Sequence, residues 1–118
     1  MIAMLFEFWF DPGDEATYQK YLAEAAHLKE TVLPALDGFL GIERFSSLSE
    51  PGKFISVGFF RDEDAVTAWR NAAEHRRVQA LGRDRFFKDY RLRMAEITRD
   101  YSKDDRAEAP SDSRTIHG

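Results

Sequence analysis

The chain has no cysteine among its 118 residues. Composition alone therefore excludes disulfide bonds, thiolate nucleophiles and sulfur-ligated zinc. The sequence also lacks a glycine-rich phosphate loop and a dinucleotide fingerprint, so bound NAD or ATP is not suggested. The apolar start MIAMLFEFWF has no basic n-region and no small-residue cleavage site, and it is too short to span a bilayer. We expect a cytoplasmic protein that does not cross a membrane, with this segment as a buried strand.

What is present is the composition of an ordinary soluble globular domain, with 43% hydrophobic and 32% charged residues. The net charge of -4 hides a basic stretch, since residues 76–93 contain seven basic and two acidic side chains. Such a stretch could hold an anionic ligand or nucleic acid. The acidic total and the lack of a recognition motif favour ion pairs with acids elsewhere, and we predict no nucleic-acid partner.

Hydrophobic periodicity and turn residues predict four strands and two helices. The strands are expected at 2–10, 39–48, 54–61 and 87–101. Asp14 is placed to cap a helix that ends before Pro34, and Asp62 is placed to cap a second helix. The second helix is expected to weaken near residues 71–73, to resume at about residue 74 and to stop at Gly82 as a C-terminal cap.

The order β-α-β-β-α-β is typical of an α+β, ferredoxin-like fold, in which helices cover one face of an antiparallel sheet. We assign residues 1–101 to this domain and residues 102–118 to a polar, mobile tail. The strands at 2–10 and 54–61 are apolar on both faces. The second face should therefore be buried too, and a homodimer that closes two sheets into a barrel would bury it.

Two segments, FISVGFFRDEDAVTAWRNAAEHRRVQALGR and DYRLRMAEITRDY, resemble the antibiotic biosynthesis monooxygenase (ABM) domain family, as does the earlier GFLGIERFSSLSEPGK. The resemblance covers roughly residues 1–101. It implies a dimeric α+β barrel with one ligand cavity per subunit between sheet and helices. Characterised members of this family include cofactor-free oxygenases of aromatic polyketides, quinol oxygenases and haem-degrading enzymes.

Functional residues carry over from these relatives only in part. Haem-degrading members have an Asn on the first strand and a Trp and a His in the second helical region. Trp69 and His75 match that region, but the only Asn in this chain is Asn71. The anthrone-type oxygenases use an Asn and a Trp near the third strand, where this chain has Phe59 and Phe60. Neither set of residues is therefore present intact.

His75 is the first candidate catalytic residue. On its helix it shares a face with Val78, Gln79 and Gly82, so it should point inward. There it could act as the general base that deprotonates a phenolic or enolic substrate, whose anion then reacts with dioxygen. The alternative is a structural histidine, hydrogen-bonded to a carbonyl where the helix weakens.

Other candidates would shape the pocket or handle negative charge. Trp69, Phe60, Phe8 and Tyr90 are the candidate substrate-binding residues, with plain core packing as the alternative for Trp69 and the phenylalanines. Arg91 and Arg93 share one face of the last strand, and either could stabilise an oxyanion. An ion pair with Glu7, Glu43 or Glu96 is the commoner fate of such an arginine.

Metal is not predicted, because the Glu24-x-x-His27 motif has no second copy. The sequence thus predicts a cytoplasmic homodimer that oxygenates a small aromatic or quinol-type molecule without a tightly bound cofactor. The sequence leaves haem or a diffusible flavin as possible cofactors. Two alternatives are kept: a haem-binding or haem-degrading protein, and a non-catalytic ligand-binding or stress-related dimeric module.

Overall fold

The computed structural model describes residues 1–72, 75–83 and 85–118. The elements follow the predicted order and are, in sequence, β1 (Ile2–Trp9), α1 (Glu15–Thr31), the short 3₁₀ turn Leu33–Ala35, β2 (Phe39–Ser46), β3 (Lys53–Phe60), α2 (Glu63–Asn71), α3 (Ala73–Leu81), a π-helical turn Gly82–Phe86, β4 (Asp89–Glu96) and α4 (Ser111–His117). The ferredoxin-like α+β fold predicted from the sequence is confirmed.

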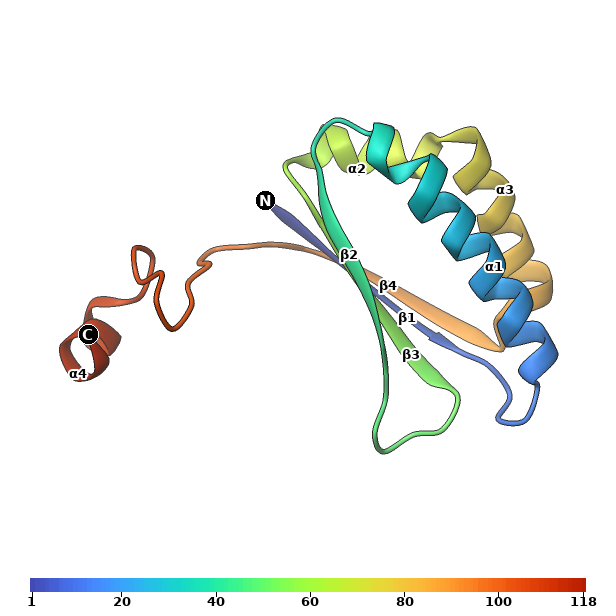
Figure 1. The fold of residues 1–118 in the computed structure, drawn as a ribbon, viewed down its shortest axis with the longest axis horizontal. Coiled ribbons are helices and arrows are strands. Elements are labelled where there is room, and N and C mark those ends of the chain that lie inside the picture. The colour runs from blue at the N-terminus through green and yellow to red at the C-terminus, as the bar shows by residue number, and fades with distance from the viewer.

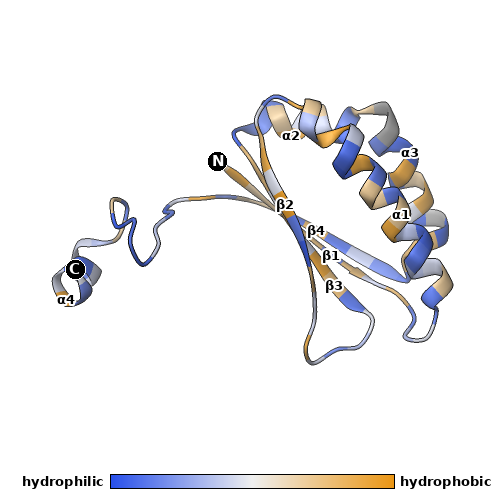
Figure 2. Ribbon diagram, viewed as in Figure 1, coloured by the Kyte–Doolittle hydropathy of each residue, from blue (hydrophilic) through white to orange (hydrophobic). Residues whose placement is uncertain are grey.

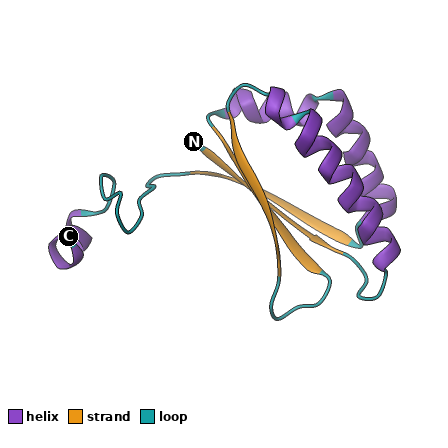
Figure 3. Cartoon of the chain, in the orientation of Figure 1, coloured by secondary structure: helices purple, strands orange, loops and turns teal.

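The four strands form one antiparallel sheet in the order β2-β3-β1-β4. The central strands β1 and β3 are also the most apolar, while β2 and β4 are the edges. Helices α1, α2 and α3 lie on one face of this sheet (Figures 1 and 3). Among the described residues, no helix lies on the other face.

The two predicted caps set where the main helices begin. The carboxylate of Asp14 accepts a hydrogen bond from the Thr17 backbone N–H at 3.2 Å, and that of Asp62 accepts one from Ala65 at 2.9 Å. Each bond satisfies a backbone donor that the first helical turn leaves unpaired. The predicted weakening near residues 71–73 is confirmed, because α2 ends at Asn71 and Ala72 adopts ψ 131° before α3.

The strand ends lie within two residues of the predicted positions except at the end of the last strand, and that boundary and the one at Gly82 differ for physical reasons. Gly82 does not end the helix in a left-handed conformation, because its φ of -60° lets the chain continue as the π-helical turn. A glycine fits there for another reason: a Cβ at this position would lie 2.6 Å from the ring of Phe87. The last strand ends at Glu96 rather than at 101, since the neighbouring β1 begins at Ile2 and leaves later residues no strand to pair with.

Residues 102–118 project away from the sheet (Figure 1). They include α4, and the Arg106 side chain donates hydrogen bonds to the backbone carbonyls of Ser102 and Gly118. These contacts lie within the segment itself. The mobility of this tail stays a prediction.

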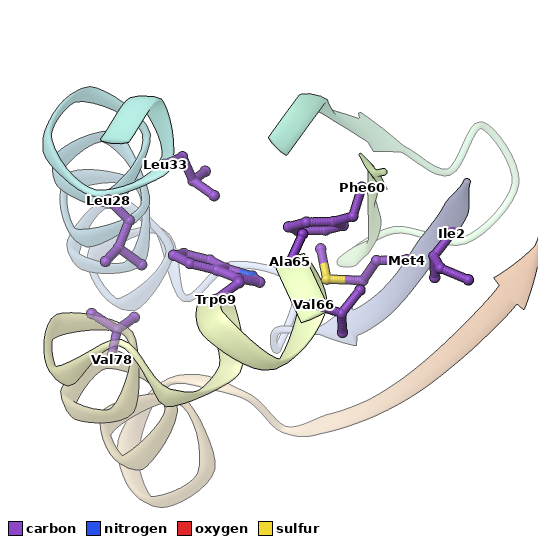
Figure 4. Close-up of a cluster of buried hydrophobic side chains, with 9 residues drawn as sticks. All are labelled: Ile2, Met4, Leu28, Leu33, Phe60, Ala65, Val66, Trp69 and Val78. Carbon is purple, nitrogen blue, oxygen red and sulfur yellow. The ribbon is translucent and has the colours of Figure 1, made fainter. Parts of the chain in front are cut away.

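The core between helices and sheet consists of two clusters. One joins helical and strand residues around Trp69 and is shown in Figure 4; its members are Ile2, Met4, Leu28, Leu33, Phe60, Ala65, Val66, Trp69 and Val78. The second is aromatic and centres on Phe8, Phe10 and Tyr21. Phe8 and Phe60 are the largest fully buried side chains of the described residues. Aromatic rings of this size contribute much of the buried apolar area.

The uncovered face of the sheet is apolar at its centre. Leu5 of β1 pairs in register with Val57 of β3. Their sequence neighbours Met4 and Gly58 lie on the helix side of the sheet, and because side chains alternate along a strand, Leu5 and Val57 point away from the helices. Figure 2 shows the hydrophobic character of β1 and β3 at the middle of the sheet. Phe45 and Phe59 add exposed rings nearby, at 47% and 36% exposure.

Candidate functional site

A cavity of about 430 Å³ lies between the helices and the covered face of the sheet. Its walls come from both layers: Met4, Phe6 and Leu92 are apolar contributions from the strands, and Leu28 and Val78 come from α1 and α3. Polar side chains at the same cavity include His75, Gln79, Tyr21, Arg44 and Ser56. An apolar enclosure with a few polar groups is the usual form of a small-molecule site.

His75 lines this cavity from the start of α3. Its Nδ1 lies 2.9 Å from the carbonyl oxygen of Trp69. Because a carbonyl oxygen only accepts hydrogen bonds, we assign the proton to Nδ1, which leaves Nε2 with its lone pair. The Gln79 amide nitrogen, 3.2 Å from the same Nδ1, then makes a contact without a hydrogen bond, and its Oε1 accepts from Arg76.

The imidazole is also stacked on the Trp69 indole. Their ring centroids are 3.5 Å apart and their planes differ by 11°. The indole is 5% exposed and lies among Leu28, Val78 and Met4 (Figure 4). Trp69 is therefore both a core residue and a wall of the cavity, and it holds His75 by its ring and by its backbone.

The surroundings of His75 keep it neutral. Burial lowers the pKa of His75 to about 4, the hydrogen bond to Trp69 opposes this, and the nearby charge of Arg76 lowers the pKa further. A low dielectric disfavours the charged form of an imidazole. At neutral pH the ring thus presents an unprotonated Nε2.

A second polar group of the cavity is formed by Tyr21, Arg44 and Ser56. The guanidinium carbon of Arg44 lies 5.2 Å from the centroid of the Tyr21 ring, a cation–π arrangement. Burial raises the pKa of the Tyr21 phenol, while the charge of Arg44 and hydrogen bonds with Arg44 and Ser56 act in the opposite direction. Ser56 is itself buried, at 5% exposure.

Two N–H donors at this cavity have no acceptor within the described part of the chain. They are Arg44 Nε and Trp69 Nε1, both fully buried. Donors left unpaired inside a protein are uncommon and costly. A bound molecule that carries oxygen acceptors would satisfy them.

The structure brings three of the predicted site residues together. His75, Trp69 and Tyr90 all line the cavity. Phe8 and Phe60 are instead fully buried in the two core clusters and do not line the cavity. Their position fits the alternative of core packing.

Arg91 and Arg93 lie on the opposite face of the sheet. In register they pair with Glu7 and Leu5, which face away from the helices. Arg93 Nη1 donates to Glu7 Oε1 at 2.5 Å, the ion pair predicted as the commoner fate. Neither arginine reaches the cavity of its own chain, so their proposed role with a substrate anion has no geometric support within one subunit.

Three residues of the cavity, Tyr21, Arg44 and Ser56, were not predicted from the sequence. A register shift in β2 between Phe39 and Gly41 explains why Arg44 was hard to place. Alternation counted from Phe39 puts odd-numbered residues on the helix side, but the irregularity exchanges the faces and turns Arg44 inward. Ser56 could have been found, because it alternates with Phe54 on β3.

The described residues contain neither a cluster of metal ligands nor a helix that could span a membrane. No group of three or more potential metal ligands occurs among the described residues. Within residues 1–72, 75–83 and 85–118, no helix is both long and apolar enough to pass through a membrane.

The comparisons with known proteins agree with the fold. The family model for antibiotic biosynthesis monooxygenase matches residues 1–81. The chain belongs to the antibiotic biosynthesis monooxygenase family. It is 38% identical over 98 residues to "Jasmonate monooxygenase ABM" of Pyricularia oryzae, an alignment that covers 83% of this chain and 44% of that protein.

Other relatives extend the likeness. "Uncharacterized protein YqjZ" of Bacillus subtilis is 34% identical over 62 residues, which cover 52% of this chain and 53% of that protein. The chain thus spans about half the length of these curated relatives. Among solved structures, Rv0793 of Mycobacterium tuberculosis superposes with a TM-score of 0.70 at 14% identity, covering 86% of this chain and 98% of that one. At this identity the structural likeness shows the fold.

Proposed function

We propose that this protein is a monooxygenase that acts on a small aromatic or quinol-type molecule in the cavity between sheet and helices, without a tightly bound cofactor. The observation that carries the proposal is the imidazole of His75, which lines an apolar cavity and is fixed by Trp69 through its Nδ1 and its ring face, so that Nε2 is left as the proton acceptor. A positioned acceptor of this kind is what proton abstraction from a phenol or an enolisable carbon requires.

The reaction balances without an added reductant. A substrate with an activated CH₂ group reacts with O₂ to give a C=O group and one water. One oxygen atom enters the substrate, and the other leaves as water with the two substrate hydrogens. The substrate supplies the two electron pairs that reduce dioxygen. The protein therefore needs only to remove a proton and to shield the resulting anion.

His75 would accept the first proton at Nε2. Nδ1–H remains on the Trp69 carbonyl, which keeps the ring in one tautomer and one orientation. The pKa of about 4 belongs to the ring without a neighbouring anion. The substrate anion formed beside the imidazolium would raise this pKa, because an opposite charge within a few ångströms favours the charged form. The apolar walls from Met4, Phe6 and Leu28 would keep bulk water from the anion.

The relative from Pyricularia oryzae supports oxygenation and widens the choice of substrate. Its name describes a jasmonate monooxygenase, and it shares 38% identity with this chain. Jasmonate therefore belongs in the substrate panel beside anthrones, naphthoquinols and catechols.

We also propose that the functional unit is a homodimer. The uncovered sheet face, with Leu5 and Val57 at its centre and Phe45 and Phe59 nearby, would be buried against the same face of a second copy. Isologous contacts of this kind are the commonest form of homodimer.

The test is dioxygen uptake by purified protein with this panel, without added metal or cofactor. His75→Phe keeps an aromatic ring against Trp69 but removes the proton acceptor, and His117→Ala, in the tail, is the matched control. We expect uptake with the wild type and the control and a loss of at least about 100-fold in His75→Phe.

Equal uptake in all three proteins would remove His75 from the mechanism. No uptake from any of them would contradict the oxygenase proposal and favour one of the two alternatives. A Soret band on haem titration that His75→Phe abolishes would then indicate a haem protein, and its absence would indicate a binding module.

A further inference from the structure

Positive charge predominates around the cavity although the chain as a whole is acidic. The cationic lining residues are Lys29, Arg44, Arg70, Arg76 and Arg83, against Glu43 as the carboxylate of the lining. Arg76 donates to the neutral oxygens of Asn71 and Gln79, so these contacts leave its charge uncompensated. Clefts lined by one sign of charge concentrate ligands of the opposite sign.

Arg44 differs from the other four because part of its guanidinium is buried. Its Nε has no hydrogen-bond partner among the described residues, and the guanidinium lies over the ring of Tyr21. The polar side chains that accompany it at the cavity, Tyr21 and Ser56, are neutral hydroxyls. A partly buried cation beside neutral partners is stabilised when an anion binds next to it.

Trp69 Nε1 is the second buried donor without an acceptor at the same cavity. A carboxylate oxygen is an acceptor that either donor could use. The rest of the lining is largely apolar, with Met4, Phe6 and Leu28 among it. The cavity therefore combines an anion-binding end with walls that suit a flat apolar body.

We propose that Arg44 binds the carboxylate of the ligand, so that this cavity prefers an apolar organic acid to its neutral counterpart. This inference deepens the proposed function by giving the substrate class, an aromatic or otherwise apolar carboxylate. It rests on the proposed function only in that both place the ligand in the same cavity. Arg44 fixes the acid group, and the remaining body of the ligand extends along the apolar wall toward His75.

The test is isothermal titration calorimetry with 2-naphthoate and 2-naphthamide, two probes of nearly equal shape that differ in charge. We expect the wild type to bind naphthoate at least about tenfold more tightly than naphthamide, and added salt to reduce that preference. Arg44→Met should remove the preference and leave naphthamide binding within about twofold, which shows that the variant is folded. Arg44→Lys should retain part of it, because the charge remains without the Nε–H donor.

Arg83→Met is the control, since it removes an exposed cation of the same cavity; its naphthoate affinity should stay within about threefold of the wild type. Equal binding of the two probes by the wild type, or a preference that survives in Arg44→Met, overturns the proposal. Failure of naphthoate to bind also overturns it.

Binding and turnover separate this proposal from the oxygenase proposal. Selective naphthoate binding without dioxygen uptake supports the role of Arg44 and contradicts the proposed reaction. Dioxygen uptake with neutral naphthoquinols, together with equal binding of the two probes, supports the reaction and overturns the role of Arg44.

Discussion

The imidazole of His75 lies flat on the indole of Trp69, with ring centroids 3.5 Å apart, and its Nδ1 is 2.9 Å from the Trp69 carbonyl oxygen. One residue thus fixes the plane, the tautomer and the position of the other. The Trp69 carbonyl also accepts the Ala72 backbone N–H at 3.3 Å, and because α2 ends at Asn71, two residues after Trp69, its second lone pair remains available to the imidazole. The interruption between these helices is therefore what positions the imidazole.

His75 should make the stability of the fold depend on pH. Burial lowers the pKa of His75 from 6.5 to about 4, so between these values the unfolded chain binds a proton that the folded chain does not. The free energy of unfolding should then decrease as the pH falls through this window. Urea unfolding at successive pH values measures the effect, and His75→Gln should give a shallower dependence there. Parallel curves for the two proteins would contradict the buried, neutral imidazole.

Gly52 should be far less tolerant of alanine than Gly13. Both glycines have positive φ, 84° and 103°, so both substitutions carry a similar backbone cost of about 1 kcal/mol. A Cβ at Gly52 would in addition lie 2.4 Å from the carbonyl oxygen of Phe10, whereas one at Gly13 meets nothing within 4 Å. We expect Gly52→Ala to lower the free energy of unfolding by about 2 kcal/mol more than Gly13→Ala. Equal losses in denaturant melts would show that the turn can shift away.

Phe8 should be among the most destabilising positions for truncation. It is fully buried and contacts the rings of Tyr21, Phe54 and Phe87 at centroid distances of 5.0, 5.6 and 5.1 Å. Phe8→Ala should cost about 3–5 kcal/mol by chemical denaturation, because it leaves a cavity in a close-packed cluster. Leu48→Ala, at a fully exposed position, is the control and should change stability by less than about 0.5 kcal/mol. A small loss at Phe8 would mean that the cluster repacks.

A charge at the centre of the uncovered sheet face should prevent dimer formation. Val57 is half-buried in the single chain and pairs in register with Leu5 and Glu43 on either side. Val57→Asp should yield a folded monomer by light scattering and circular dichroism, because an unpaired carboxylate cannot be buried in an apolar interface. Leu48→Asp, outside the sheet, should leave the dimer intact. A wild-type protein that is itself monomeric would contradict the dimer proposal.

Much of the fold could be predicted because its signals are local. Asp14 and Asp62 cap helices by reaching backbone donors three residues away, a contact that the sequence spacing already contains. The ion pair of Arg93 was expected from strand alternation and from the choice of nearby acids, and Glu7 is its partner. His75 was expected to point inward from the helical spacing, and it lines the cavity.

The extent of the site could not be predicted in the same way. Phe8 and Phe60 are aromatic, as residues that line a substrate pocket often are, but they do not border the cavity. Which aromatic rings border an empty volume depends on how the helices pack against the sheet. Tyr21 was assigned no role, although its phenol lies beside Arg44 and Ser56. These three residues come from α1, β2 and β3, so no single stretch of sequence contains the group.

The sequence by itself determined the order of strands and helices, the capped helix starts and the apolar character of both sheet faces, because each depends on residues within a few positions of one another. The tertiary structure alone decided that Arg44 faces the helices and that Arg91 and Arg93 face away. A single register shift in β2 exchanges the faces of every residue that follows it, since side chains alternate along a strand. The pairing of β4 with β1 fixes the other two arginines opposite Glu7 and Leu5.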